Sequence, residues 1–122
     1  MRHFVAGLLL SILSFNSAAD EWDGALRLDS YDVLGEYWKA DEIPMEAFRN
    51  LLRFRETLRV EMDLLVRENG TVVSRITEPS GNDAYDSAVR EAVEQYQFQP
   101  TPENDPPTAV VVPYYRSQGR RQ

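Results

Sequence analysis

The alternation of apolar and polar residues along the chain predicts a β-hairpin near its middle. In residues 58–67 every second side chain is apolar, which is the pattern of a strand with one buried face. A second strand follows the turn signal Glu68–Asn69–Gly70 and ends at Pro79. The positions of the first strand that are expected to face away from the core are Arg59, Glu61, Asp63, Leu65 and Arg67.

The loop of this hairpin decides which residues face each other. A two-residue Asn-Gly loop would place Leu64 opposite Arg75, whereas a three-residue Glu-Asn-Gly loop places Met62 opposite Ile76. The three-residue loop keeps apolar side chains together and is therefore favoured. It requires Gly70 to adopt the left-handed conformation that glycine tolerates best.

Two segments have the three-to-four-residue apolar spacing of a helix that lies on a sheet. The first is predicted over residues 41–54. Asp41 is its expected N-cap, and Pro44 falls in the first turn, where a missing N–H costs no hydrogen bond. Its expected apolar stripe consists of Met45, Phe48, Leu51 and Leu52.

The second predicted helix starts at Asn82 or Asp83, either of which can act as its cap. Asp86 and Arg90 are four residues apart and are expected to face water and to pair. Pro100 is expected to stop the helix. The stripe expected to lie on the sheet consists of Tyr85, Ala88, Val89, Ala92, Val93 and Tyr96.

Residues 108–115 form the last predicted strand, because they are rich in β-branched and aromatic side chains. Pro113 cannot donate a ladder hydrogen bond, so it places this strand at a sheet edge or at a bulge. Residues 20–43 are apolar enough to pack, but their pattern does not choose between strand and helix. The order helix, strand, strand, helix, strand predicts a small α+β domain, with an antiparallel sheet of about three strands and helices packed on one face.

The N-terminus has the parts of a secretory signal peptide. Arg2 and His3 precede an apolar run from Phe4 to Leu13, and small residues follow up to Ala19. The run is shorter than the about 20 apolar residues that a membrane-spanning helix needs. We therefore expect cleavage after Ala19. The expected division of the chain is a signal peptide at 1–19, an N-terminal extension at 20–42, a folded domain at 43–115 and a flexible tail at 116–122.

The composition leaves little room for catalytic chemistry. His3 is the only histidine and would leave with the signal peptide, and the chain has no cysteine. Nucleophilic catalysis and zinc or copper sites are therefore not expected. Asn82, Asp83 and Asp86 lack the ligand spacing of a calcium loop, and a net charge of −7 disfavours nucleic acid. We expect no enzyme, no metal, no cofactor, no small-molecule substrate and no nucleic-acid partner.

The motifs of the central and C-terminal parts, taken in order, resemble the C-terminal domain shared by TonB and TolA. They are an alternating strand, a glycine turn, a second strand, Ser-Gly, a helix with small residues, Phe-x-Pro and a last strand. The resemblance covers residues 43–115. Its matching positions are Gly70, Val72, Ser80, Gly81, Asp86, Ala88, Ala92, Val93, Phe98 and Pro100, with Pro44 and Ala47 ahead of the first strand.

This resemblance implies a protein-interaction module in the periplasm of a Gram-negative bacterium. It implies strand addition at the last strand, an outer-membrane receptor or a Tol–Pal-type envelope protein as partner, and a link to TonB-dependent transport. With a cleaved signal and little chain ahead of the domain, we expect a free binding module rather than a motor-driven transducer. The alternative is a structural or weakly homodimerising envelope protein. The expected partner-binding residues of this edge strand are Val110, Val111, Val112, Tyr114 and Tyr115.

The signal peptide leads to a first prediction. The protein recovered from the periplasm should begin at Asp20, because the small residues before it are placed for cleavage. Mass spectrometry of the intact exported protein measures this directly. An uncleaved chain that starts at Met1 in the membrane fraction would contradict it.

Overall fold

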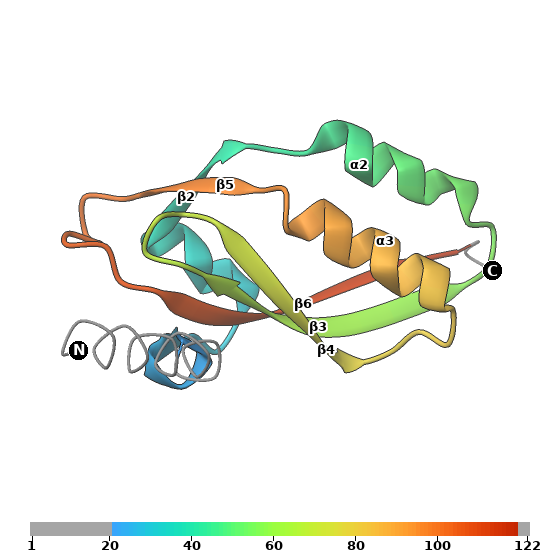
Figure 1. The fold of residues 1–122 in the computed structure, drawn as a ribbon, viewed down its shortest axis with the longest axis horizontal. Coiled ribbons are helices and arrows are strands. Elements are labelled where there is room, and N and C mark those ends of the chain that lie inside the picture. Colours follow the sequence, from blue (N-terminus) through green and yellow to red (C-terminus); the bar gives the residue numbers. More distant parts are fainter. Residues whose placement is uncertain (1–20, 120–122) are drawn as a thin grey trace, which may run out of the picture.

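A four-stranded sheet forms the body of the structure, a computed structural model that describes residues 21–119. The strand order is β1-β6-β3-β4, and a separate two-stranded ribbon pairs β2 with β5 (Figure 1). The α+β class is confirmed, with four strands in the sheet rather than about three. The signal peptide expected at residues 1–19 lies outside the described residues. The elements are β1 (Leu26–Arg27), the 3-10 helix η1 (Tyr31–Glu36), β2 (Trp38–Glu42), α2 (Met45–Arg49), the 3-10 helix η2 (Asn50–Arg53), β3 (Leu58–Val66), β4 (Val72–Glu78), α3 (Asp83–Val93), β5 (Gln97–Pro100) and β6 (Val110–Gln118).

The predicted hairpin is formed by β3 and β4 at the centre of the chain. Met62 lies opposite Ile76, so the three-residue register is confirmed. Gly70 has a φ of 86°, the left-handed conformation expected of it. The Asn69 side chain supports the turn, because its Oδ1 accepts from the Thr71 N–H at 3.1 Å.

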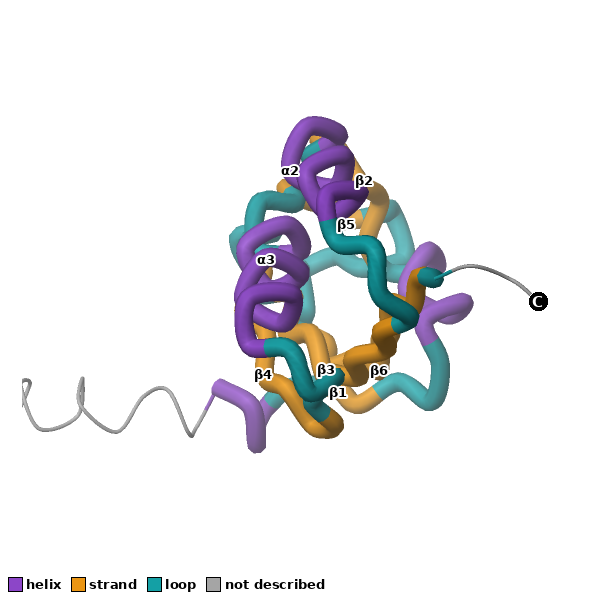
Figure 2. Tube along the Cα trace, turned by 90° about the vertical axis from the view of Figure 1, so that its right-hand side faces the viewer, coloured by secondary structure: helices purple, strands orange, loops and turns teal. Residues whose placement is uncertain are grey.

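The core lies between one face of the sheet and the helices α2 and α3, which Figure 2 shows together on that face. Phe48 and Tyr96 join the two helical segments, with ring centroids 5.8 Å apart. Each large apolar side chain that is fully buried here contributes about 1.5–3 kcal/mol. The buried core residues from the strands of the main sheet are Leu58, Val60, Met62, Leu64, Val66, Val72, Val110 and Val112.

Helix α3 starts as predicted, but one of its acidic residues does not face water. Asn82 is the cap, and its side chain accepts from the Tyr85 N–H at 3.0 Å. Asp86 is buried rather than solvated, and accepts from the Ser80 N–H at 3.2 Å. The expected Asp86–Arg90 pair is therefore wrong, because the aspartate satisfies a main-chain donor in the turn before the helix.

The first predicted helix is shorter than its pattern suggested. Residues 38–42 form β2 instead, so Asp41 is not the cap, and α2 begins at Met45 and continues as the tighter η2. With three residues per turn, η2 points its apolar side chains in other directions than the predicted α-helix would. Leu51 is buried, whereas Met45 and Leu52 are 63% and 72% exposed.

The ribbon of β2 and β5 has no counterpart in the sequence prediction. Helix α3 ends at Val93, before Pro100, and the residues that follow pair with β2. Phe98 is buried there, and its N–H donates to the Gly70 carbonyl at 3.0 Å. This bond joins the ribbon to the central hairpin.

The two ends of the described chain are more ordered than expected from their patterns. Leu28, Leu34 and Trp38 of the N-terminal extension are buried in the core. The extension thus contributes the strands β1 and β2 and the 3-10 helix η1, where the sequence had left strand and helix open. At the other end β6 continues to Gln118, beyond position 115 where the domain was expected to end.

Gly70 gives a stability prediction. An added Cβ would collide with the Phe98 carbonyl, and the positive φ is strained for alanine. Gly70→Ala should therefore lower the free energy of unfolding by about 3 kcal/mol and Tm by more than about 10 °C.

Gly35→Ala is the matched control, because a Cβ at Gly35 meets no atom within 4 Å. It should change the free energy of unfolding by less than about 1 kcal/mol. Thermal unfolding followed by circular dichroism compares the two variants, and equal Tm values would refute the described turn.

Candidate partner-binding edge

The last strand, β6, lies between two neighbours at its start and has only one neighbour afterwards. β3 pairs antiparallel with it over its whole length. β1 pairs parallel with Val110 and Val111 only, through bonds from Leu26 N–H to the Ala109 carbonyl (2.9 Å) and from Leu28 N–H to the Val111 carbonyl (2.8 Å). The expectation of an edge strand is therefore wrong at its first two residues. From Val112 onward, no strand within residues 21–119 pairs with the outer side of β6.

The direction of the main-chain groups on β6 follows from these two bonds. Ala109 and Val111 present their carbonyls to β1. Main-chain groups alternate in direction along a regular strand, and the β3–β6 register has no break. The same outer side is therefore faced by Pro113, Tyr115 and Ser117, whereas the residues between them face β3.

Pro113 explains why the pairing with β1 is so short. The next rung of a parallel ladder would need an N–H at position 113, and proline has none. The proline costs no bond to β3, because its missing donor lies on the outer side. Beyond it, Tyr115 and Ser117 each present both an N–H and a C=O to that side. We call the stretch from Pro113 to Gln118 the open edge.

The opposite edge of the sheet, β4, is blocked by helix α3. The Ser74 N–H, which faces away from β3, donates to the Glu94 carboxylate at 2.9 Å. The Ser74 carbonyl accepts from the Arg90 guanidinium at 3.3 Å. Side chains thus satisfy the middle of this edge, one of the ways in which proteins prevent unwanted strand pairing. The open edge of β6 has no such protection among the described residues.

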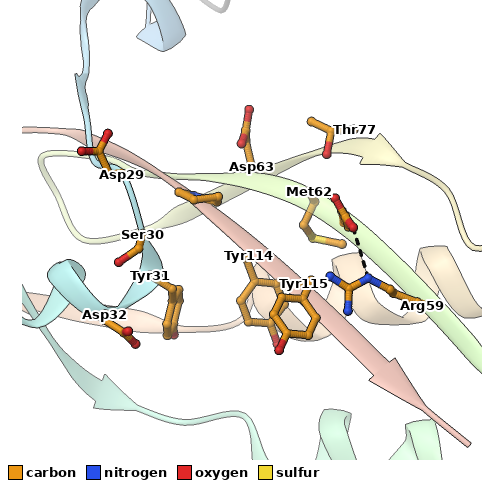
Figure 3. A pocket seen from close by; sticks show the side chains of 12 residues that line it. Asp29, Ser30, Tyr31, Asp32, Arg59, Met62, Asp63, Thr77, Tyr114 and Tyr115 are labelled. Atoms are coloured by element: carbon orange, nitrogen blue, oxygen red, sulfur yellow. Dashed lines mark hydrogen bonds and ion pairs between the residues drawn. The ribbon is translucent and has the colours of Figure 1, made fainter.

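A hollow of about 590 Å³ lies beside the open edge (Figure 3). Tyr115 is 57% exposed, and the Arg59 guanidinium stacks 4.0 Å above its ring centroid. Tyr31 from η1 and Tyr114 from β6 meet with ring centroids 5.4 Å apart. Burial raises the pKa of Tyr31 to about 12, with smaller contributions from nearby tyrosines, so it stays neutral at physiological pH.

An ion-paired group borders this hollow on the outer face of the sheet. Asp63 of β3 is buried and accepts from Arg27 at 3.2 Å and from Arg75 at 3.3 Å. Arg27 reaches Asp63 from β1, on the far side of β6. The Arg27–Asp63 ion pair therefore connects β1 to β3 across β6, the strand that carries the open edge.

The structure places the five predicted binding residues in three different settings. Val110 and Val112 are buried in the main core. Val111 is also buried, but on the outer face opposite Leu65, a residue expected to be solvated. Tyr114 is partly buried, and Tyr115 is exposed. None of the three valine side chains is accessible to a partner. Their main-chain groups are paired as well, those of Val110 and Val112 with β3 and the carbonyl of Val111 with β1.

Sequence reasoning missed several residues of this region. It identified Pro113 as an edge or bulge residue, but gave no role to Ser117, Arg59 or Tyr31. The alternation of β6 predicts that Ser117 shares a side with Tyr115. Nothing in the local pattern brings Tyr31 or Arg59 beside them, because that contact joins distant segments.

The described residues contain no feature of a metal site or a membrane span. Within residues 21–119 no three side chains of His, Cys, Asp or Glu cluster as metal ligands. None of the helices in that part of the chain is long and apolar enough to cross a membrane.

Residues 38–113 match a known family, described as TonB C terminal. The match covers more than half of the chain, so the protein belongs to the TonB C-terminal family. Domains of this family are non-enzymatic protein-interaction modules of the periplasm. No curated protein and no solved structure matches the chain. The family match begins at Trp38, so β1 and η1 precede it.

The alternation along β6 can be tested by proline substitution. Tyr115→Pro should cost less than about 1 kcal/mol relative to Tyr115→Thr, because its N–H faces the open side. Tyr114→Pro should cost about 3 kcal/mol relative to Tyr114→Thr, because it removes a ladder bond and leaves a β3 carbonyl unpaired.

Comparing proline with threonine at each position removes the effect of losing the tyrosine ring. Urea unfolding gives the four free energies. Equal proline costs at positions 114 and 115 would show that the directions of the main-chain groups are wrongly assigned.

Proposed function

We propose that this protein binds an extended segment of a cell-envelope partner by strand addition at the open edge of β6. The observation that carries the proposal is the set of main-chain groups at Pro113, Tyr115 and Ser117 that no described residue pairs. On the other edge of the sheet, Arg90 of α3 and Glu94 just after it bond to the main chain of Ser74, at the middle of β4. An incoming strand therefore meets less obstruction on the side of β6.

The open edge is short, and this limits what main-chain bonds can contribute. Each hydrogen bond has a net value of about 1 kcal/mol, which must offset the loss of freedom on association. Side chains of the partner must therefore contribute as well. Alternate residues of an added strand point to opposite faces, so one set would meet Tyr115 and Arg59 and the other would meet Tyr31 and Tyr114.

Membership of the family supports the class of partner. An outer-membrane receptor or a Tol–Pal-type envelope protein fits a periplasmic interaction module. The same family membership supports a link to TonB-dependent transport. The cleaved signal peptide expected from the sequence would deliver the protein to that compartment.

Partner capture can be tested with a photo-reactive amino acid at Ser117, an exposed position on the outer side of β6. Crosslinking in intact cells should capture an envelope protein. Tyr115→Pro should reduce the yield at least about fivefold relative to Tyr115→Thr, because it removes the donor at the centre of the open edge. Tyr115→Thr retains the N–H and serves as the matched control.

Two outcomes would redirect the proposal. Capture that persists in the folded Tyr115→Pro variant would show that the partner binds elsewhere. A crosslink between two copies of this chain, together with a dimer in sedimentation analysis, would favour the structural or homodimerising alternative.

A further inference from the structure

Residues 21–28, here called the clasp, lie ahead of the family match and occupy the start of the edge that the proposed function uses. Leu26 and Leu28 donate their N–H groups to the carbonyls of Ala109 and Val111. These are the same kind of bonds, on the same side of β6, that a partner strand would form. The chain therefore places one of its own strands in line with the open edge.

Exposed polar contacts hold the first part of the clasp. Glu21 pairs with Arg67 at 2.8 Å, and the two side chains are 38% and 41% exposed. The ring of Trp22 lies under the Arg75 guanidinium at 4.2 Å. The Glu21–Arg67 pair is bidentate, with a second bond of 3.1 Å, but water partly screens side chains of this exposure. β1 pairs with β6 at two residues, whereas β3 pairs with it along its whole length, so the clasp is attached less firmly than β3.

Leu28 marks the point at which the chain becomes firmly anchored. It is buried in the main core, whereas Leu26, two residues earlier, is 42% exposed. Beyond Leu28, the side chains of Leu34 and Trp38 are also buried. Residues 21–27 can consequently leave the edge while the following 3-10 helix stays in place. Their release breaks the Arg27–Asp63 ion pair, and Arg75 remains paired with the buried Asp63.

We propose that the clasp is an intramolecular competitor that limits strand addition at β6. This inference rests on the proposed function, since it concerns the same edge. A partner segment that fits between Pro113 and Gln118 binds beside the clasp. A longer segment that extends toward Val111 meets the clasp and must displace it, so the clasp selects against long strands and weakens their binding.

A disulfide lock tests the competition, because the chain has no cysteine of its own. Arg27 and Val111 are direct partners in the parallel pair. Their Cα atoms are therefore about 4.8 Å apart, within the range that a disulfide spans. In Arg27→Cys/Val111→Cys, oxidation should hold the clasp on the edge, and reduction should release it.

The readout is crosslinking from Ser117 to outer-membrane proteins solubilised in detergent. The released form should give at least a fivefold higher yield than the locked form, about the value of one main-chain hydrogen bond. Leu26→Pro, which removes the N–H donated to Ala109, should likewise raise the yield about fivefold over wild type. Leu26→Ala keeps that donor and should stay within twofold of wild type.

The outcomes separate the two proposals. Equal yields from the locked and released forms, with Leu26→Pro equal to Leu26→Ala, would overturn the clasp and leave strand addition intact. An absence of capture in every form would overturn strand addition and the competition together. Circular dichroism establishes that each variant is folded. If the cysteine substitution disturbs the packing at Val111, the comparison of Leu26→Pro with Leu26→Ala decides whether the clasp competes.

Discussion

Each residue of β6 directs its N–H and C=O either toward β3 or away from it, and the domain is organised around how the outward groups are satisfied. At the start of the strand the chain itself supplies a partner, β1. At Pro113 the outward donor is missing, and the pairing with β1 ends there. After Pro113 the outward groups of Tyr115 and Ser117 have no strand beside them within the described residues. One proline thus separates an internally paired half of the edge from an open half.

Helix α3 both covers the core face of the sheet and places polar side chains against the edge of β4. Its apolar side covers the core face of the sheet, where Tyr85, Val89 and Val93 are buried. Its polar side supplies Arg90 and Glu94 to the main chain of β4. A short helix placed this way both buries the hydrophobic face and protects one edge from pairing. The two edges therefore differ: side chains satisfy the middle of β4, whereas no described strand or side chain does so for the outward groups in the later part of β6.

The segment ahead of the family match packs on both faces of the sheet. Its later part belongs to the core through Leu28 and Leu34. Its earlier part lies on the outer face, where Leu65 borders a hollow together with Glu21 and other residues of the clasp. Leu65 is buried there, although its nearest neighbours on the same face, Asp63 and Arg67, are charged. The outer face is therefore not a uniformly solvated surface, because the N-terminal segment packs on it.

The sequence by itself determined the features that depend on near neighbours. The hairpin register, the left-handed Gly70 and the Asn82 cap follow from local sterics and short-range hydrogen bonds, and all three are confirmed. Tertiary structure alone decided the pairing of β1 with β6 and the β2–β5 ribbon. In both, main-chain groups are satisfied by a distant segment that local periodicity does not identify. For the edge proposed to bind a partner, the pattern pointed to β6, whose later part has no strand on its outer side within the described residues. The length of its open part depended on a neighbour from the other end of the chain, because hydrogen-bonding groups on a strand are free only where no other strand reaches them.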